Sequence, residues 1–141
     1  MNIEVDQLIE NLPGFMPTKA RNEYRGKINP TACGVVNMDV STGSGTHFVC
    51  FFNNPSREHA IYYDSYACLP PEEIQTFLKS SGKTICYNTT QHQPINSVLC
   101  GYYCVYVLRE LTKGRKYMDV LNDFSFEPQE NEQMLIKEFN L

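Results

Sequence analysis

The sequence predicts an α+β fold in which a small mixed β-sheet packs against a central helix. Segments with apolar residues at helical spacing are interspersed with short β-rich runs. Two of these runs, residues 46–52 and 60–64, flank a turn signal and therefore form a hairpin. The apolar, aromatic-rich segment from Cys100 to Thr112 is typical of a helix buried against such a sheet. Because helices and strands are partly segregated along the chain, the class is α+β.

The N-terminal part of the chain is predicted to contain one helix and one strand. Residues 3–11 place apolar side chains at helical spacing, and the Pro13-Gly14 pair ends that helix. Residues 15–30 are mixed and polar, so we predict irregular structure there. Residues 33–37 are a short β-rich run and indicate a strand.

The hairpin follows a predicted flexible loop at residues 41–45, which are Gly, Ser and Thr only. The nearly continuous apolar character of residues 46–52, broken by His47, predicts a strand covered on both faces. Residues 53–56 are a turn signal, and residues 60–64 form the returning strand.

The C-terminal half is predicted to contain three helices and one short strand. Pro70-Pro71 opens a helix whose first-turn glutamates suit its macrodipole, and Gly82 ends it. Residues 84–87 form the strand, and residues 118–127 show no decisive pattern. The other two helices run from Cys100 to about Thr112 and from Pro128 to Asn140.

Bulk properties limit the classes of function. With 141 residues the chain is predicted to be one domain, residues 1–141, large enough for a substantial core. A net charge of −4 without a basic run argues against nucleic acid as the main ligand. No stretch is apolar enough to cross a membrane, and the acidic N-terminus lacks the layout of a signal peptide. Six cysteines without that signal indicate a reducing compartment.

Cys100 is the predicted catalytic nucleophile. A polar, turn-prone loop at residues 93–99 leads directly into the buried helix that Cys100 begins. A helix N-terminus carries partial positive charge and unpaired N–H groups, which favour the thiolate, the reactive form of a thiol. The same N–H groups would stabilise an oxyanion that forms beside the sulfur.

His47 is the predicted general base among three histidines. His59 lies in a charged turn and His92 in a polar loop, so both are interpreted as exposed to solvent. His47 follows the predicted flexible loop and begins an otherwise apolar strand. An isolated histidine in that place is more often a core residue than a catalyst, but a cysteine nucleophile needs a base, and the base needs an orienting group.

Asp64 is the predicted orienting group. Alone, it would be interpreted as a turn or cap residue. In a hairpin, however, the start of the first strand lies opposite the end of the second, which makes His47 and Asp64 near neighbours. A carboxylate hydrogen-bonded to one imidazole nitrogen fixes the tautomer and stabilises the imidazolium.

The loop before Cys100 offers two candidate oxyanion donors, Gln93 and Gln91. A side-chain amide can donate to a developing oxyanion beside the backbone N–H of Cys100. Either glutamine could equally be a loop residue that faces water. Gly101 would let the substrate backbone approach the helix start, although tight helix packing explains a glycine there as well.

The remaining cysteines are interpreted as packing residues. Cys104 lies one turn after Cys100 and could form a redox pair with it, but a small buried side chain is the simpler interpretation. No pair of cysteines has the short spacing of a zinc knuckle, so no metal site is predicted. The other four lie in or near strands: Cys33, Cys50, Cys68 and Cys86.

Three motifs in a fixed order resemble the adenovirus-type cysteine proteases, a family related to the SUMO-deconjugating proteases. The likeness spans roughly residues 12–111 and looks most like the maturation proteases of virophages and polinton-like viruses. Each motif alone is weak, but the order His, Asp, Cys differs from that of papain and is fairly specific. The motifs are Gly45-Thr46-His47-Phe48, Tyr62-Tyr63-Asp64-Ser65, and Gln93 followed by Cys100-Gly101-Tyr102-Tyr103-Cys104.

The resemblance implies a papain-like site on a permuted, adenain-like α+β scaffold. In that family the matching positions make His47 the base, Asp64 the orienting group and Cys100 the nucleophile, with Gln93 as oxyanion donor. Phe48 stands where many relatives have tryptophan. We also predict that the substrate is bound by Gly45, Phe48 and Gly101.

The predicted function is that of a cysteine endopeptidase that cleaves viral capsid or other structural precursors during virion maturation, after small residues such as glycine. It needs no cofactor. A DNA activator is not expected from the acidic composition, while a peptide activator stays open. The expected location is the virion and the cytoplasmic virus factory of the host cell. The alternatives are an isopeptidase acting on SUMO or ubiquitin and a non-catalytic Cys/His zinc or interaction module.

Overall fold

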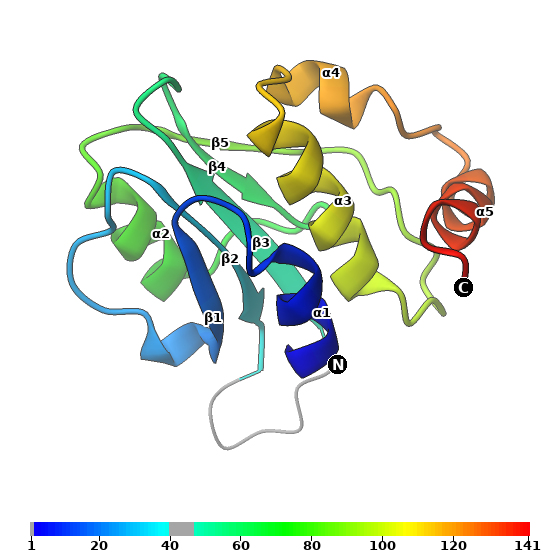
Figure 1. The fold of residues 1–141 in the computed structure, drawn as a ribbon, viewed down its shortest axis with the longest axis horizontal. Coiled ribbons are helices and arrows are strands. Elements are labelled where there is room, and N and C mark those ends of the chain that lie inside the picture. The colour runs from blue at the N-terminus through cyan, green and yellow to red at the C-terminus, as the bar shows by residue number, and fades with distance from the viewer. Residues whose placement is uncertain (1, 40–46) are drawn as a thin grey trace.

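A five-stranded mixed sheet runs through the molecule with helices on both faces (Figure 1). The structure is a computed structural model and describes residues 2–39 and 47–141. The strands lie in the sheet in the same order as in the chain. They are β1 (Phe15–Ala20), β2 (Ala32–Asn37), β3 (Phe48–Asn53), β4 (Ala60–Tyr63) and β5 (Ile85–Tyr87).

The three middle strands are antiparallel, and each edge strand pairs in parallel with its neighbour. The β3–β4 register places Cys50 opposite Tyr63, so the predicted hairpin is confirmed. All six residues of the central strand β3 are buried, as expected for a strand covered on both faces. This register brings the residue before β3 and the residue after β4 to the same end of the sheet.

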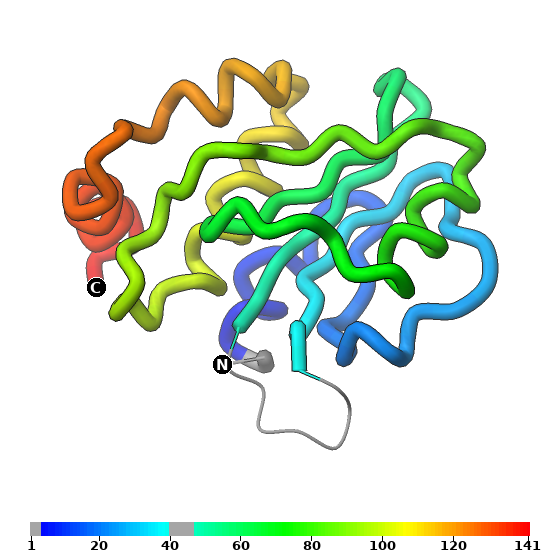
Figure 2. The backbone as a smooth tube through the Cα atoms, turned by 180° about the vertical axis from the view of Figure 1, so that it is seen from behind, coloured from blue at the N-terminus to red at the C-terminus, as the bar shows by residue number. Residues whose placement is uncertain are grey.

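Two apolar cores separate the sheet from its helices. Alternate side chains of β2, β3 and β4 point to opposite faces, so that Val35 and Cys50 enter one core while Val36 and Val49 enter the other. The first core lies under α1 (Asn2–Ile9), α3 (Cys100–Thr112), α4 (Tyr117–Leu121) and α5 (Pro128–Phe139). The second lies under α2 (Glu72–Lys79), on the face turned to the viewer in Figure 2.

The predicted helices at the N-terminus, after Pro71, at Cys100 and at Pro128 are confirmed, and α4 occupies part of the segment without a decisive pattern. Within the described ranges, no helix is long and apolar enough to cross a membrane.

The prediction of irregular structure for residues 15–30 is wrong, because this segment holds β1 and a short 3-10 helix, η1 (Arg21–Glu23). The burial of β1 alternates only weakly, as expected of an edge strand, so its local pattern gives little strand signal. Gly14 makes the turn from α1 into β1. Its φ is +74°, and a Cβ there would lie 2.4 Å from the carbonyl oxygen of Thr31, so a glycine is required.

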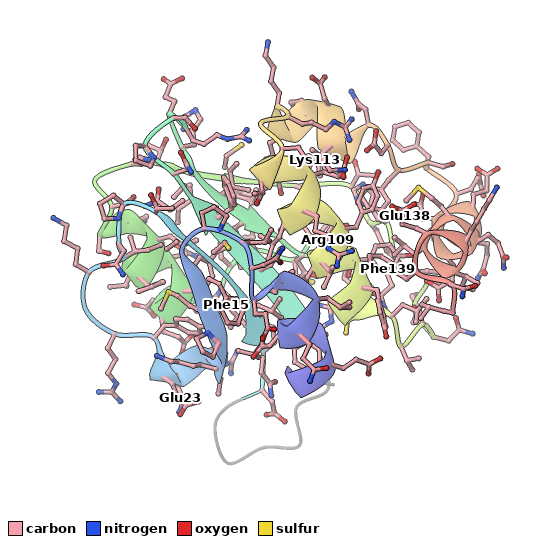
Figure 3. The ribbon with its side chains drawn as sticks, viewed as in Figure 1. Phe15, Glu23, Arg109, Lys113, Glu138 and Phe139 are labelled. Atoms are coloured by element: carbon pink, nitrogen blue, oxygen red, sulfur yellow. The ribbon has the colours of Figure 1, made fainter. Side chains whose placement is uncertain are left out.

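Arg109 fixes α3 to its neighbours in the first core. Its Nε and Nη2 atoms donate to the carbonyl oxygen of Leu8, 3.2 and 2.9 Å away, in the last turn of α1. The guanidinium also lies 5.7 Å from the ring centroid of Phe139 in α5 (Figure 3). A cation at a helix C-terminus satisfies an otherwise unpaired carbonyl and interacts favourably with the dipole. These contacts hold α3, and therefore its first residue, in a defined position.

Candidate active site

Cys100 is the first residue of α3, the helix labelled in Figure 1. It belongs to the first core and is 6% exposed. The residues of α3 are buried almost throughout, including Gly101, Tyr103 and Cys104. This packing fixes the sulfur beside the N–H groups that open the helix, which have no partner within the helix itself.

His47 and Asp64 meet at this end of the β3–β4 hairpin. His47 immediately precedes β3, and its carbonyl oxygen accepts from the backbone N–H of Met38 at 2.8 Å. Asp64 immediately follows β4 and is 1% exposed. The His47 Nε2 and Asp64 Oδ1 atoms are 2.8 Å apart. The structure therefore brings together the two residues that strand register predicts to be neighbours.

Asn88, the residue after β5, holds the backbone of Asp64 through two hydrogen bonds. Its Oδ1 accepts from the Asp64 N–H at 3.0 Å, and its Nδ2 donates to the Asp64 carbonyl oxygen at 2.7 Å. Asn88 is buried, and sequence reasoning missed it. Only its place just after the short predicted strand at residues 84–87 hinted at a position beside Asp64.

Cys100 also lies close enough to the imidazole of His47 to influence its pKa. Burial by itself lowers the pKa of His47, but the hydrogen bond to Asp64 and the influence of the Asp64 and Cys100 charges outweigh burial and raise this pKa to about 9. Since Nε2 is bonded to Asp64, Nδ1 is the ring nitrogen left to face the sulfur. The structure thus gathers these three residues, from three distant parts of the chain, at one end of the sheet, with a hydrogen bond between His47 and Asp64.

Gln93 lies inside the loop that leads to Cys100. Its side chain is fully buried: Oε1 accepts from the hydroxyl of Ser65 at 2.5 Å, and Nε2 lies 3.0 Å from Oγ and 3.2 Å from the carbonyl oxygen of Ser97. Gln91 is exposed, and its amide donates to the Gln93 carbonyl oxygen at 2.8 Å. In this arrangement the Gln93 amide orders the loop beside Cys100.

The three predicted substrate-binding residues have different environments. Gly45 lies outside the described residues, as does the predicted loop at residues 41–45. Phe48 is 4% exposed and packs in the first core, where its carbonyl oxygen accepts from the Cys104 thiol at 3.6 Å. Gly101 is buried in the first turn of α3. Substrate binding by these residues stays a prediction.

The six cysteines are all free thiols. Cys104 is fully buried, and burial raises its pKa well above the usual range, which suits a packing role better than a redox role. Cys68 is exposed, so its interpretation as a packing residue is wrong. Among residues 2–39 and 47–141, no group of three or more His, Cys, Asp or Glu side chains is placed to hold a metal ion.

His92 is buried, contrary to the interpretation from sequence, whereas His59 is partly exposed as expected. The His92 ring stacks on Phe124 with centroids 4.3 Å apart, and its Nδ1 lies 2.9 Å from the Tyr63 hydroxyl. Its carbonyl oxygen accepts from the Asn131 side chain at 3.1 Å. Burial lowers the pKa of His92 to about 4.

We expect His92 to make the fold sensitive to mild acid. Its folded-state pKa of about 4 lies below the ordinary 6.5, so its contribution to stability is complete above pH 6.5 and is lost as pH falls toward 4. At pH 5 the loss is about 2 kcal/mol. Urea unfolding at several pH values should show that His92→Asn flattens this dependence, while His59→Asn, as a matched control, leaves it unchanged. An unaltered slope in His92→Asn would contradict the assignment.

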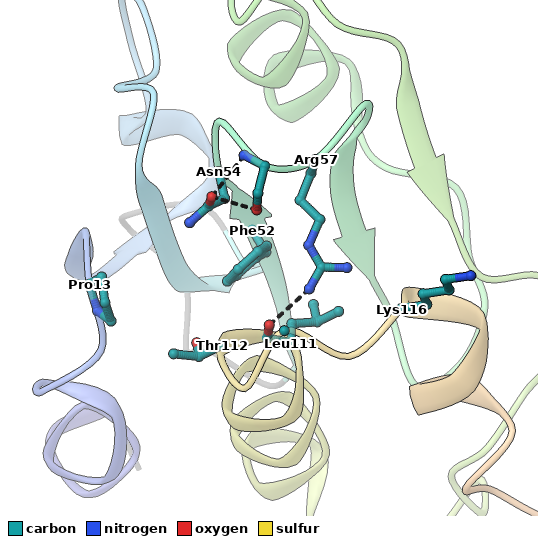
Figure 4. Close-up of a pocket in the computed structure, with 9 residues that line it drawn as sticks. Pro13, Phe52, Asn54, Arg57, Leu111, Thr112 and Lys116 are labelled. Carbon is teal, nitrogen blue, oxygen red and sulfur yellow. Dashed lines mark hydrogen bonds between the residues drawn. The ribbon is translucent and has the colours of Figure 1, made fainter.

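A pocket of about 390 Å³ lies at the opposite, C-terminal end of α3 (Figure 4). Arg57 crosses it, stacking 5.4 Å from the Phe52 centroid and donating to the Leu111 carbonyl oxygen at 2.8 Å. The pocket is far along α3 from Cys100, and its lining holds neither a cysteine nor a histidine. Arg57 adds a hydrogen bond to an end-of-helix carbonyl that already accepts from the Gly114 N–H, so the contact stabilises α3.

No protein-family model matches the sequence, and no curated protein matches it. Among solved structures, the chain is similar to a crystal structure of the ASFV pS273R protease, with a TM-score of 0.54 and 25% identity, covering 64% of this chain and 38% of that one. A second structure of that protease gives a TM-score of 0.55 and 21% identity, covering 72% and 40%. The chain thus spans about two fifths of the length of these ASFV structures.

The chain is also similar to a structure of the SUMO protease Ulp1 whose catalytic cysteine is oxidised to a sulfinic acid. The TM-score is 0.53 with 11% identity, covering 95% of this chain and 70% of that one. Identity this low establishes the fold alone. The predicted α+β fold class is confirmed: the chain has the mixed-sheet fold shared by the SUMO protease and the ASFV protease.

Proposed function

We propose that this chain is a cysteine endopeptidase in which Cys100 is the nucleophile, His47 the acid–base group and Asp64 the orienting carboxylate. The observation that carries the proposal is the 2.8 Å contact between His47 Nε2 and the buried carboxylate of Asp64, with Cys100 close enough to help raise the pKa of His47. An imidazolium beside the sulfur stabilises the thiolate, and a buried carboxylate stabilises the imidazolium. The fold shared with cysteine proteases supports the same activity.

The reaction has two halves. The Cys100 sulfur attacks the scissile carbonyl carbon, and the C–N bond breaks as the His47 imidazolium gives its proton to the leaving amine. A water molecule then attacks the acyl carbon while His47 takes one of its protons, and the C–S bond breaks, which releases the acid and regenerates the thiolate. Backbone N–H groups at the start of α3 are the proposed donors to the oxyanion. Gln93 is the proposed side-chain donor, which requires its buried amide to turn from Ser97 toward the substrate, and exposed Gln91 is the alternative.

The proposed substrates are capsid or other structural precursors of a virus related to virophages and polinton-like viruses, cut after small residues. The sequence resemblance supports this class, and so does the 25% identity with a protease of viral origin. The proposed site of action is the virion and the virus factory. An isopeptidase acting on SUMO or ubiquitin is the second candidate, supported by the similarity to the SUMO protease fold.

Incubating the wild-type protein with three substrate sets tests the proposal. The sets are a proteome-derived peptide library, a capsid precursor, and SUMO and ubiquitin conjugates, with new termini identified by mass spectrometry. We expect cleavage of internal peptide bonds in the library and in the precursor, after small residues. Cleavage confined to the modifier conjugates would identify the isopeptidase instead. Absence of cleavage in all three would contradict the proposed chemistry.

A further inference from the structure

Three consecutive residues after β4 connect His47 to the loop that leads to Cys100. Asp64 holds His47 through its carboxylate. Ser65 holds Gln93, because its carbonyl oxygen accepts the Gln93 N–H at 3.1 Å and its hydroxyl donates to the Gln93 side chain at 2.5 Å. Tyr66, the third residue, contacts both the base and the loop before the nucleophile. The contact between Asp64 and His47 has an expected function, whereas the contacts of Tyr66 have none assigned so far.

The ring of Tyr66 packs against the ring of His47. The two centroids lie 4.9 Å apart with an angle of 37° between the planes. An aromatic face within about 6 Å of a cation attracts it, so this contact favours the imidazolium form of His47. The backbone N–H of Tyr66 also donates to Asp64 Oδ1, the atom that bonds His47, at 2.8 Å. Tyr66 therefore restrains both partners of that bond.

The hydroxyl of Tyr66 reaches across to the loop that leads to Cys100. Its oxygen lies 3.1 Å from the carbonyl oxygen of Pro94 and 3.2 Å from that of Ile95, so its proton is shared between them. Ile95 is 86% exposed and Val98 is 76% exposed, so this loop has little packing to hold it in place. The Tyr66 hydroxyl therefore adds a second attachment to the one that buried Gln93 makes through Ser65 and Ser97.

The backbone makes a tight turn at Ala67, directly after Tyr66. Ala67 has a φ of +60°, in the left-handed region that alanine rarely adopts, and its N–H donates to the Asp64 carbonyl oxygen at 2.7 Å. This tight turn reverses the chain directly after Tyr66. Unusual backbone conformations of this kind persist where surrounding contacts over-determine them, often at functional sites.

We propose that Tyr66 is a positioning residue that latches the base His47 to the loop carrying the nucleophile Cys100. The ring packs on the imidazole and favours its cationic form, and the hydroxyl holds Pro94 and Ile95, so that base and nucleophile keep one relative position. This role deepens the proposed peptidase function and rests on it for its catalytic meaning. The latch itself, however, has consequences that can be measured without any substrate.

Two variants separate the two parts of the latch. Tyr66→Phe removes the hydroxyl and keeps the ring, so we expect the Ser97 and Leu99 amides to exchange with deuterium about three- to tenfold faster, with the His47 titration unchanged. Tyr66→Leu removes both, so the midpoint of His47 titration, followed by NMR, should also fall by about half a pH unit. Tyr106→Phe is the matched control, since its hydroxyl bonds Asp123 at 2.6 Å on another part of the molecule.

The outcomes decide the proposal. Wild-type exchange in Tyr66→Phe would overturn the hydroxyl latch, and an unchanged His47 midpoint in Tyr66→Leu would overturn the role of the ring. Because Tyr66→Phe changes the side chain only by the hydroxyl, its exchange measurement still tests the proposal if Tyr66→Leu lowers overall stability. Turnover is assayed separately: a wild-type chain without peptidase activity would contradict the proposed function and leave the exchange and titration results readable.

Discussion

Replacing Cys100 with alanine is expected to abolish peptide hydrolysis and to leave the fold intact. Without the sulfur no acyl-enzyme forms, and the rate should fall by a factor of at least about 10⁴. The change deletes one atom from a side chain at the edge of the first core, so the free energy of unfolding should change by about 1 kcal/mol or less. Peptide hydrolysis and thermal unfolding by circular dichroism measure the two effects.

Cys86→Ala is the matched control for this variant, because Cys86 is a partly buried thiol of β5 that the proposed chemistry does not use. It should keep wild-type turnover. Retained turnover in Cys100→Ala would contradict the assignment of the nucleophile. A Cys100→Ala chain that fails to fold, together with wild-type protein that unfolds on addition of a chelator, would indicate the zinc-module alternative instead.

Replacing His47 with alanine is expected to remove both the general base and the cation that activates the sulfur. We expect kcat/KM to fall by about 10³- to 10⁴-fold. In the wild-type protein, iodoacetamide should modify Cys100 faster than the exposed Cys68, whose pKa is raised by partial burial of its sulfur and by the charge of Asp64. In His47→Ala, modification of Cys100 near neutral pH should become slower, as measured by mass spectrometry of the modified peptides.

The pH dependence follows from the raised pKa of His47. Because this pKa is about 9 in the folded protein, hydrolysis should decline as pH rises through about 9, when the imidazolium loses the proton that the leaving amine needs. The contribution of the same contacts to the free energy of unfolding is complete below pH 6.5 and is lost as the pH rises through about 9. In Asp64→Asn, which removes the charge bonded to His47, the decline should begin at a lower pH.

His59→Ala is the control for His47→Ala, because His59 is partly exposed and bonds the Thr84 hydroxyl, away from the candidate active site. It should leave hydrolysis and modification rates unchanged. Equal modification rates of Cys100 in the wild-type protein and in His47→Ala would count against the pairing of sulfur and imidazole.

Much of the fold could be predicted because its signals are local. Apolar spacing identified α1, α2 and α5, and the turn signal at residues 53–56 identified the β3–β4 hairpin. The hairpin in turn predicted that His47 and Asp64 are neighbours, because strand register is a local geometric constraint. The placement of Cys100 at a helix start followed from the change between a polar loop and an apolar run.

The features that could not be predicted depend on contacts between distant segments. β1 exists because it pairs in parallel with β2, and a short edge strand has no strong pattern of its own. His92 lies in a loop as polar as that around His59, yet it is buried because Phe124 and Asn131 cover it. Nothing near Tyr66 in the chain indicates that its ring lies on His47 and its hydroxyl on Pro94.

The sequence by itself determined which residues could do chemistry at all: a cysteine opening a helix, and a histidine and an aspartate at one end of a hairpin. The tertiary structure alone decided which neighbours surround them, namely the burial of His92 and Gln93, the support of Asp64 by Asn88 and the position of Tyr66. The physical reason is that periodicity and register act over a few residues, whereas burial and hydrogen bonding depend on segments that meet only in the folded chain.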